Sequence, residues 1–322
     1  MSKALRLPLH KARVIAGFVI ALCTLSGCIG LPQSDALWQG DIGLPQSADL
    51  DAVPFFAQEQ YQCGPAALAM LLNASGVTVQ PEDLVAEVYL PARKGSLQVE
   101  MLATARRHGL LAYVLAPELK DVLSELAAGN AVAVLLNQGL FAAFPYWHYA
   151  VAVGYDLRKQ EIFLHSGTKA HLAVSLRLFE FMWKDGGRWA MVALPPGRMP
   201  ASAREMPYAR AAAALEQTGH IAAAQQSYAA LLRRWPGDLV GLMGLGNTAY
   251  ALGQLAQAEA AFRKATLAHP DSAAAYNNLA QALADQGKRD AALLAARKAV
   301  SLGGASLRAA QATLEQIQRL QP

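Results

Sequence analysis

The sequence predicts an α+β domain over residues 51–196, followed by an all-α domain of helical repeats over residues 205–322. Helical and strand patterns alternate in the first part, whereas the chain beyond residue 200 is rich in alanine and helical to its end. Three sets of residues in the second part recur every 34 positions. A chain of 322 residues with 54% hydrophobic residues is large enough for two packed cores.

The first 27 residues have the features of an export signal. Four basic residues precede a mostly apolar run at residues 14–25, which is shorter than the roughly 20 residues that cross a bilayer. The stretch LSGC that follows resembles the lipobox of bacterial lipoproteins. The resemblance implies lipidation of Cys28 and, with Ile29 after it, an anchor at the periplasmic face of the outer membrane. Residues 28–50 contain GLPQS twice and are expected to form a tether.

The charge of the exported chain argues against a nucleic-acid partner. Of the 28 Lys and Arg residues, four lie in the export signal, and the remaining 24 equal the 24 Asp and Glu residues. A protein that binds nucleic acid needs a clustered basic surface. We therefore expect the chain to bind no nucleic acid.

Cys63 is the one thiol expected to remain in the exported chain. Cys23 lies in the removed segment, and Cys28 would carry the lipid. A thiol without a disulfide partner in an oxidising compartment needs a functional explanation. Cys63 is therefore a candidate nucleophile.

The residues after Cys63 predict a buried helix. Gly64 and Pro65 favour a helix start, and residues 66–73 are apolar on all sides. Unpaired backbone N–H groups and the macrodipole at a helix N-terminus favour a thiolate over a thiol. The sequence thus places Cys63 where a nucleophile would be activated.

A thiol nucleophile needs a base, and His148 is the best-placed candidate. It begins the apolar run at residues 146–156, which is typical of a buried central strand, and residues 161–164 predict its neighbour. His165 ends that second strand and is a further candidate. Residues 51–196 contain no HExxH, CxxC, P-loop or G-x-S-x-G sequence, so we expect no metal or cofactor.

The segments VPFFAQEQYQCGPAALAMLL and WHYAVAVGYD together resemble the papain-like peptidases that cut leaders after a double glycine. That domain occurs fused to bacteriocin exporters and also free-standing. The resemblance implies a papain-like α+β fold, Cys63 as nucleophile, His148 as general base and a glutamine that stabilises the oxyanion. Gln58 is the candidate for the glutamine, although Gln60 and Gln62 would share its side of an extended chain.

The sequence departs from that family where an aspartate usually orients the imidazole. Ser166 occupies this place, and Asp156 is the alternative orienting residue. A neutral acceptor stabilises an imidazolium less than a carboxylate does. The sequence therefore predicts a cysteine peptidase that acts on a peptide or protein, with a weak or inactive peptide-binding domain as the alternative. Acyl transfer would use the same pair of residues.

The second part has the 34-residue helix–turn–helix period of tetratricopeptide repeats. The recurring residues are Gly219, Gly253 and Gly287; Ala224, Ala258 and Ala292; and Pro236, Pro270 and Gly304. Residues 306–320 predict a final capping helix. Gly244 and Gly246 imitate a dinucleotide-binding motif but lie in the middle of a predicted helix. Since such repeats bind peptides or helices in a groove, we expect a protein partner.

Overall fold

The computed structural model describes four stretches of the chain, residues 31–37, 43–58, 62–139 and 145–319. The expected export signal over residues 1–27 and the expected lipidation site Cys28 lie outside the described residues. None of the described helices is both long enough and apolar enough to cross a lipid bilayer.

The first folded part is built on an antiparallel sheet. Its described strands follow the order β4, β9, β5, β6, β7, β8, and β1 pairs with the end of β6. They are β1 (Ser47–Asp49), β4 (Leu111–Val114), β5 (Val132–Asn137), β6 (Trp147–Asp156), β7 (Glu161–Ser166), β8 (Lys169–Ser175) and β9 (Ala190–Leu194). A separate hairpin joins β2 (Tyr89–Leu90) to β3 (Gly95–Ser96). Because β5 and β7 flank β6, this strand lies in the middle of the sheet.

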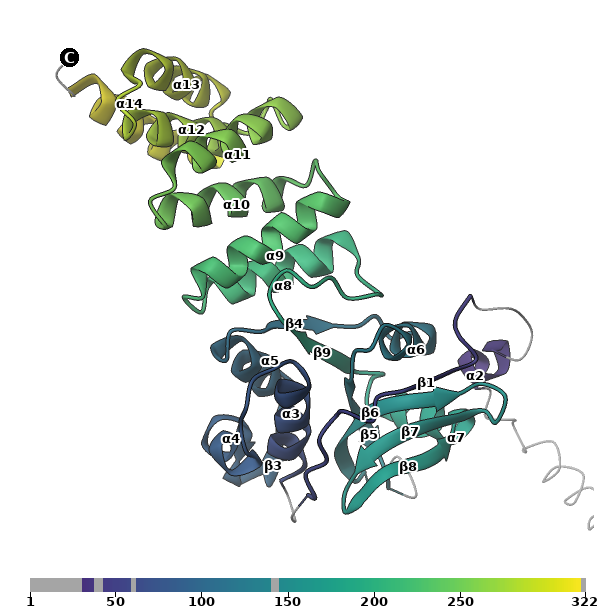
Figure 1. Cartoon of the computed structure of the whole chain (residues 1–322). Helices are drawn as coiled ribbons and strands as arrows, with labels where there is room; N and C mark the ends of the chain where they lie inside the picture. Colours follow the sequence, from purple (N-terminus) through teal and green to yellow (C-terminus); the bar gives the residue numbers. More distant parts are fainter. Residues whose placement is uncertain (1–30, 38–42, 59–61, 140–144, 320–322) are drawn as a thin grey trace, which may run out of the picture.

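Helices cover both faces of the sheet (Figure 1). One face carries α3 (Cys63–Ala74), α4 (Pro81–Val88) and α5 (Gln98–Arg107), and the other carries α6 (Leu119–Ala127) and α7 (Leu176–Asp185). Successive strand residues point to opposite faces, so Val134 of β5 enters one core and Ala133 the other. Burial on both faces explains why the central strands are almost continuously apolar.

The expectation of a tether over residues 28–50 was wrong for most of its described length. α2 (Pro32–Leu37) packs on α7, where Glu180 is fully buried. The Glu180 carboxylate accepts hydrogen bonds from the backbone N–H and the Oγ of Ser34, both at 2.7 Å, and from the backbone N–H of Gln33 at 3.2 Å. Burying a carboxylate is costly unless it is hydrogen-bonded. α2 supplies those bonds and is therefore a packed element of the domain.

The strand β1 that follows α2 also packs on the domain. Asp49 of β1 pairs with Gly154 of β6. A Cβ atom at Gly154 would lie 2.5 Å from the carbonyl oxygen of Ala48, which is closer than real contacts allow. Gly154 therefore permits the close approach of β1 to the central strand.

The second folded part is a stack of helices that extends away from the sheet (Figure 1). Its helices are α8 (Glu205–Glu216), α9 (Ile221–Arg234), α10 (Leu239–Ala251), α11 (Leu255–Ala268), α12 (Ala273–Ala284), α13 (Arg289–Leu302) and α14 (Leu307–Arg319), with a 3₁₀ turn, η2 (Gly304–Ser306), before α14. Each helix packs on the next. The predicted fold class, an α+β domain followed by an all-α repeat region, is confirmed.

Two glycines of α10 let the repeats pack closely. A Cβ atom at Gly244 would lie 2.2 Å from the ring of Tyr228, and one at Gly246 would lie 2.3 Å from the ring of Phe262. The two aromatic rings come from α9 and α11, which flank α10. The glycine pattern that imitates a dinucleotide-binding motif is thus explained by helix packing.

The first repeat helix belongs to the core of the sheet domain. Tyr208 and Ala209 of α8 are fully buried in the same cluster as Tyr113 of β4. Nearby, the buried Glu125 carboxylate accepts hydrogen bonds from the backbone N–H and the Oγ of Ser202, which lies between β9 and α8. The first repeat helix is therefore packed against the sheet domain and hydrogen-bonded to it through the segment that precedes it.

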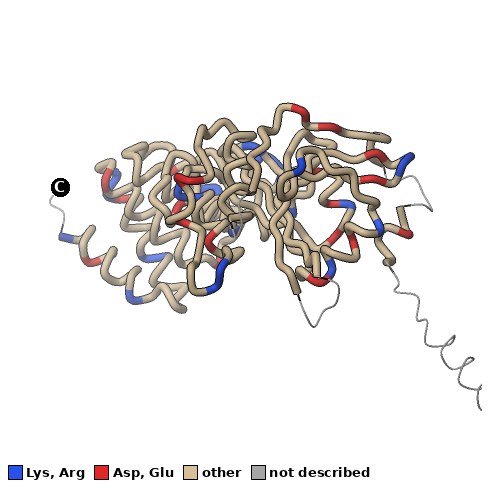
Figure 2. Tube along the Cα trace, turned by 90° about the horizontal axis from the view of Figure 1, so that it is seen from below, with Lys and Arg blue, Asp and Glu red and all other residues tan. Residues whose placement is uncertain are grey.

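Charged residues of both signs are interspersed along both folded parts (Figure 2). The described part of the chain shows no continuous basic stripe in this view. This distribution agrees with the near-neutral charge of the sequence after the export signal.

Candidate active site

Cys63 is the first residue of α3 and faces a cleft. The following residues of α3, up to Leu72, are buried against the sheet, whereas Cys63 itself is half-buried. The cleft has a volume of about 460 Å³ and contains Cys63 and His148 in its lining. The chain is therefore folded so that a rigid, buried helix presents its N-terminal thiol to an accessible cavity.

The environment of the Cys63 sulfur has opposing effects on its pKa. Burial raises the pKa of the thiol, and backbone hydrogen bonds from Tyr149, Gly64 and Cys63 itself lower it by a smaller amount. The net shift is upward. The helix N-terminus does not overcome desolvation here, so the resting residue at neutral pH is a thiol.

Gly64 is required by the close packing of the cleft wall. A Cβ atom at this position would lie 2.1 Å from Ser96 Oγ and 2.5 Å from Ser96 Cβ. Ser96 belongs to β3 and lines the same cleft as Cys63. Its carbonyl oxygen accepts a hydrogen bond from the Tyr149 hydroxyl at 3.3 Å. The glycine after the cysteine thus lets the hairpin form one wall of the cleft.

His148 is positioned by the central strand. It is the second residue of β6, lies opposite Leu136 of β5, and is 6% exposed. Its Nε2 lies 2.9 Å from Ser166 Oγ, at the end of β7. In the tautomer with the proton on Nε2, the ring donates to Ser166 and leaves Nδ1 unprotonated. Such a ring can act as a base through Nδ1.

Burial lowers the pKa of His148 to about 4 from its ordinary value of 6.5. Ser166 is a neutral partner and offers the imidazolium no opposite charge. At neutral pH the resting pair is therefore an uncharged imidazole and an uncharged thiol.

Stability should depend on pH through His148. Since its pKa in the folded protein lies below 6.5, the unfolded chain binds a proton first as the pH falls. The contribution of neutral His148 to the free energy of unfolding is fully present above pH 6.5 and is lost as the pH falls to about 4. Between pH 7 and pH 4.5 we expect the free energy of unfolding, measured with urea, to fall by ~2–3 kcal/mol more in the native protein than in His148→Gln. Equal losses in both proteins would contradict this assignment.

Gln58 joins the ends of β6 and β7. Its Oε1 accepts a hydrogen bond from the backbone N–H of Gly167 at 3.2 Å, and its Nε2 donates to the carbonyl of Tyr149 at 3.3 Å. The backbone N–H of Gln58 also donates to the carbonyl of Gly167 at 3.0 Å. Gln58 lines the cleft with Cys63, and a second Nε2 hydrogen is left for a ligand. Gln60 lies outside the described residues, and Gln62 precedes α3.

The other candidate residues lie in different surroundings. Asp156 is at the opposite end of β6 from His148, where Oδ1 accepts hydrogen bonds from the backbone N–H groups of Arg158 and Lys159. It does not reach the imidazole, so Ser166 is the orienting candidate that contacts His148. His165 is buried, and its Nε2 lies 3.2 Å from a backbone carbonyl, that of Val53. This position gives His165 a structural role beneath the N-terminal segment.

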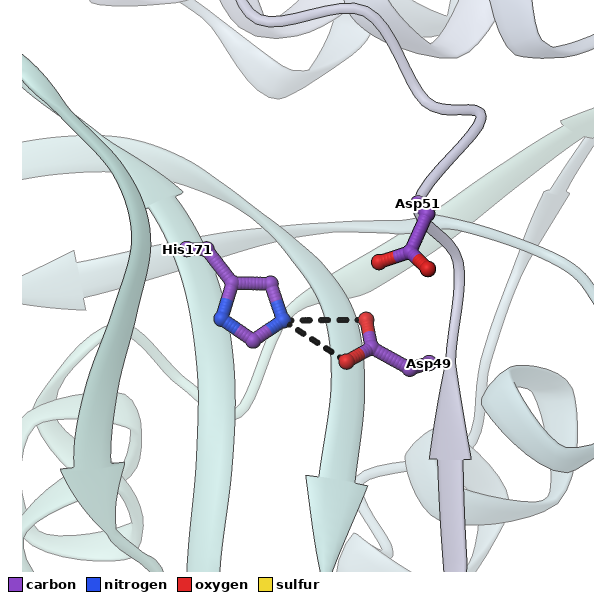
Figure 3. A group of neighbouring side chains, drawn as sticks. All are labelled: Asp49, Asp51 and His171. Atoms are coloured by element: carbon purple, nitrogen blue, oxygen red, sulfur yellow. Dashed lines mark hydrogen bonds and ion pairs between the residues drawn. The ribbon is translucent and has the colours of Figure 1, made fainter.

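A second group of polar side chains lies on the surface (Figure 3). His171 Nε2 lies 2.9 Å from both carboxylate oxygens of Asp49, with Asp51 beside them. One ligand atom from each residue lies within 4.8 Å of the others, which a cation could bridge. The His171 ring also stacks on Phe163 of β7, with ring centroids 4.4 Å apart. These contacts fasten β1 to β7 and β8.

The cleft residues of the β2–β3 hairpin were not predicted from the sequence. Arg93, Lys94 and Ser96 line the cleft with Cys63, although they lie 30 or more positions after it in sequence. The strands of this hairpin have two residues each, which is too short for a recognisable alternation. The sequence signal in this segment is limited to Pro91 and Gly95, which are typical of a turn.

The fold and the cleft together define a two-part protein, in which a sheet domain with a Cys–His cleft precedes helical repeats. Residues 50–169 match the Peptidase_C39 like family, and residues 243–312 match the tetratricopeptide repeat family. The chain therefore contains a peptidase C39-like domain followed by tetratricopeptide repeats. No curated protein matches the sequence.

Solved structures resemble each part separately. A crystal structure described as a C39-like peptidase from Bacillus anthracis is 18% identical and covers 47% of this chain and 98% of its own, with a TM-score of 0.40. The TPR2B domain of yeast Sti1 in a pHsp70 complex is 20% identical and covers 35% of this chain and 97% of its own, with a TM-score of 0.33. The Yersinia enterocolitica chaperone SycD with a YopD peptide is 20% identical and covers 34% of this chain and 89% of its own, also with a TM-score of 0.33.

Proposed function

We propose that the protein is a lipid-anchored cysteine peptidase of the bacterial cell envelope that cleaves a peptide or protein. The observation that carries the proposal is the placement of Cys63, His148 and Gln58 around one cleft within a peptidase C39-like domain. A thiol, a base and an amide donor are the groups that acyl-transfer chemistry on a peptide requires.

In the proposed first half-reaction, Cys63 Sγ attacks the carbonyl carbon of the scissile bond. Its proton passes to the neutral imidazole of His148, and the carbonyl oxygen becomes an oxyanion. The free Nε2 hydrogen of Gln58 and the backbone N–H of Cys63 stabilise that charge. Collapse of the intermediate breaks the C–N bond, and the leaving amine takes the proton from His148. A thioester on Cys63 remains.

In the second half-reaction, His148 takes a proton from water while the water oxygen attacks the thioester. The C–S bond breaks, the carboxylic acid leaves, and Cys63 recovers its proton. Because the resting pair is uncharged, proton transfer accompanies each attack and does not precede it. Ser166 Oγ accepts the hydrogen bond from the Nε2–H group of His148 throughout and keeps the ring oriented.

The repeats are proposed to recruit the substrate or a protein partner, since tetratricopeptide repeats generally mediate protein–protein interactions. A hollow of about 180 Å³ lies between α10, α11 and α12. Amide side chains line it, among them Asn247 and Asn278, which hydrogen-bond to each other at 2.9 Å. Amides can both donate to and accept from a peptide backbone. This chemistry suits an extended segment of a partner.

The proposed anchor is a lipid on Cys28 at the periplasmic face of the outer membrane. Leu31, three residues later, is already buried against the domain. Three residues span at most about 10 Å, so a lipid on Cys28 would hold the sheet domain against the membrane surface. Several acyl chains on one residue anchor a protein stably.

The proposed activity is tested by comparing protein N-termini in envelope extracts treated with native protein and with Cys63→Ala. Native protein should generate new N-termini that Cys63→Ala does not, because the thioester cannot form without the sulfur. Both proteins should give matching circular-dichroism spectra. Identical sets of N-termini from the two treatments would contradict the peptidase proposal.

The neutral partner of His148 favours a second candidate function, a peptide-binding domain with weak or absent hydrolysis. An uncharged acceptor such as Ser166 stabilises the imidazolium less than a carboxylate would. In that case, peptides recovered by crosslinking to the cleft should be the same for native protein and Cys63→Ala, and all should be intact. Peptides that end at a new C-terminus only with native protein would reject this candidate.

A further inference from the structure

One wall of the cleft carries positive charge. Arg93 ends the 3₁₀ turn η1 (Pro91–Arg93) and Lys94 follows it, in the hairpin between β2 and β3. Both residues line the cavity that contains Cys63, and no Asp or Glu is among the described residues that line it. Within the described part of the chain, the Arg93 guanidinium has no hydrogen-bonding or ion-pair partner.

The cleft continues into a second hollow, and Arg93 lies where the two meet. This hollow has a volume of about 320 Å³ and shares Arg93 and Trp147 with the main cleft. Its one described carboxylate, that of Asp185, accepts a hydrogen bond from Asn137 Nδ2 at 3.2 Å. Among the described residues of the two cavities, the one carboxylate therefore lies in the adjoining hollow, which Arg93 also lines.

We propose that Arg93 forms a subsite that binds an aspartate or glutamate side chain of the peptide whose backbone lies against Cys63. This inference rests on the proposed peptidase function for the identity of its ligand. Arg and Lys donate charge-assisted hydrogen bonds to carboxylates, and a guanidinium can bind both oxygens at once. Partly enclosed walls focus the field of the guanidinium on the cleft.

The neighbouring side chains suit a peptide better than a polyanion. Tyr146, just before β6, and Trp147, its first residue, are 58% and 49% exposed and offer apolar contact to residues beside the acidic one. A nucleic acid needs several phosphate contacts along a basic track, and this cleft supplies two cations. A peptide with a basic side chain at this position would be repelled.

The charge of the cleft can be measured through Cys63 itself without any hydrolysis. Iodoacetate is an anion and iodoacetamide is neutral, and both alkylate the same sulfur. The rate constant for iodoacetate divided by that for iodoacetamide therefore reports the local potential and rises where the potential is positive. At low salt the ratio for the native protein should exceed the ratio for glutathione. In Arg93→Glu it should fall about three- to tenfold, and added salt should reduce the difference. The matched control, Arg297→Glu on α13, makes the same charge change at an exposed position of the repeats and should leave the ratio unchanged.

The outcomes separate this inference from the proposed function. An unchanged ratio in Arg93→Glu would overturn the subsite, even if Cys63-dependent cleavage is observed. A fall in the ratio without any cleavage would support the subsite as part of a binding cleft and count against the peptidase. Once a cleaved peptide is known, replacing a glutamate beside its cleavage site by glutamine should raise KM for the native protein and have little effect with Arg93→Glu.

Discussion

His148→Ala is expected to lower the rate of Cys63-dependent cleavage by about 10²–10⁴-fold, the range that general acid–base groups contribute. The loss should be large because both the thiol and the imidazole are uncharged at rest, so the sulfur has no preformed thiolate to attack with. Single-turnover cleavage of a fluorescent peptide derived from the envelope experiment would measure it.

The control for this loss is His171→Ala, which removes another histidine from the same sheet. His171 is exposed and contacts Asp49 on the surface, so its removal should leave the cleavage rate within about twofold. Cleavage by His148→Ala at the native rate would show that Cys63 uses another base. It would also remove the role assigned to β6 in positioning the reaction.

The sequence predicted the parts of the site that depend on local patterns. Gly64 and Pro65 indicated a helix start at Cys63, and the apolar run after His148 indicated a central strand. The repeats were predicted because small residues recur every 34 positions, and three of them, Gly219, Gly253 and Gly287, adopt positive φ in the turns between helices. Such signals are short-ranged or periodic, and a single sequence contains them.

Features that depend on distant partners could not be predicted in this way. The bonds from α2 to Glu180 join residues 146 or more positions apart, so GLPQS looked like a tether. The amide of Gln58 bridges strands that begin 89 or more residues later. The pKa of Cys63 was also misjudged, because a helix N-terminus is visible in sequence and the degree of burial is not.

Ser166→Asp is expected to convert the resting pair toward a thiolate and an imidazolium. The substitution places a carboxylate where Ser166 Oγ now lies, 2.9 Å from His148 Nε2. An opposite charge this close raises a histidine pKa by about 1–3 units, here from about 4. Alkylation of Cys63 by iodoacetamide at pH 7 should accelerate about tenfold or more, and kcat/KM for peptide cleavage should rise with it.

Ser166→Asn separates the effect of charge from that of size. Asparagine matches aspartate in shape but is neutral, so it should leave the pKa of His148 low and the alkylation rate near the native value. An NMR titration of the imidazole in each variant would measure the pKa directly. If Ser166→Asp raises that pKa and speeds alkylation while cleavage stays absent, the missing carboxylate is not what limits hydrolysis. The domain would then be a binding domain that retains the cleft of a peptidase without its reaction.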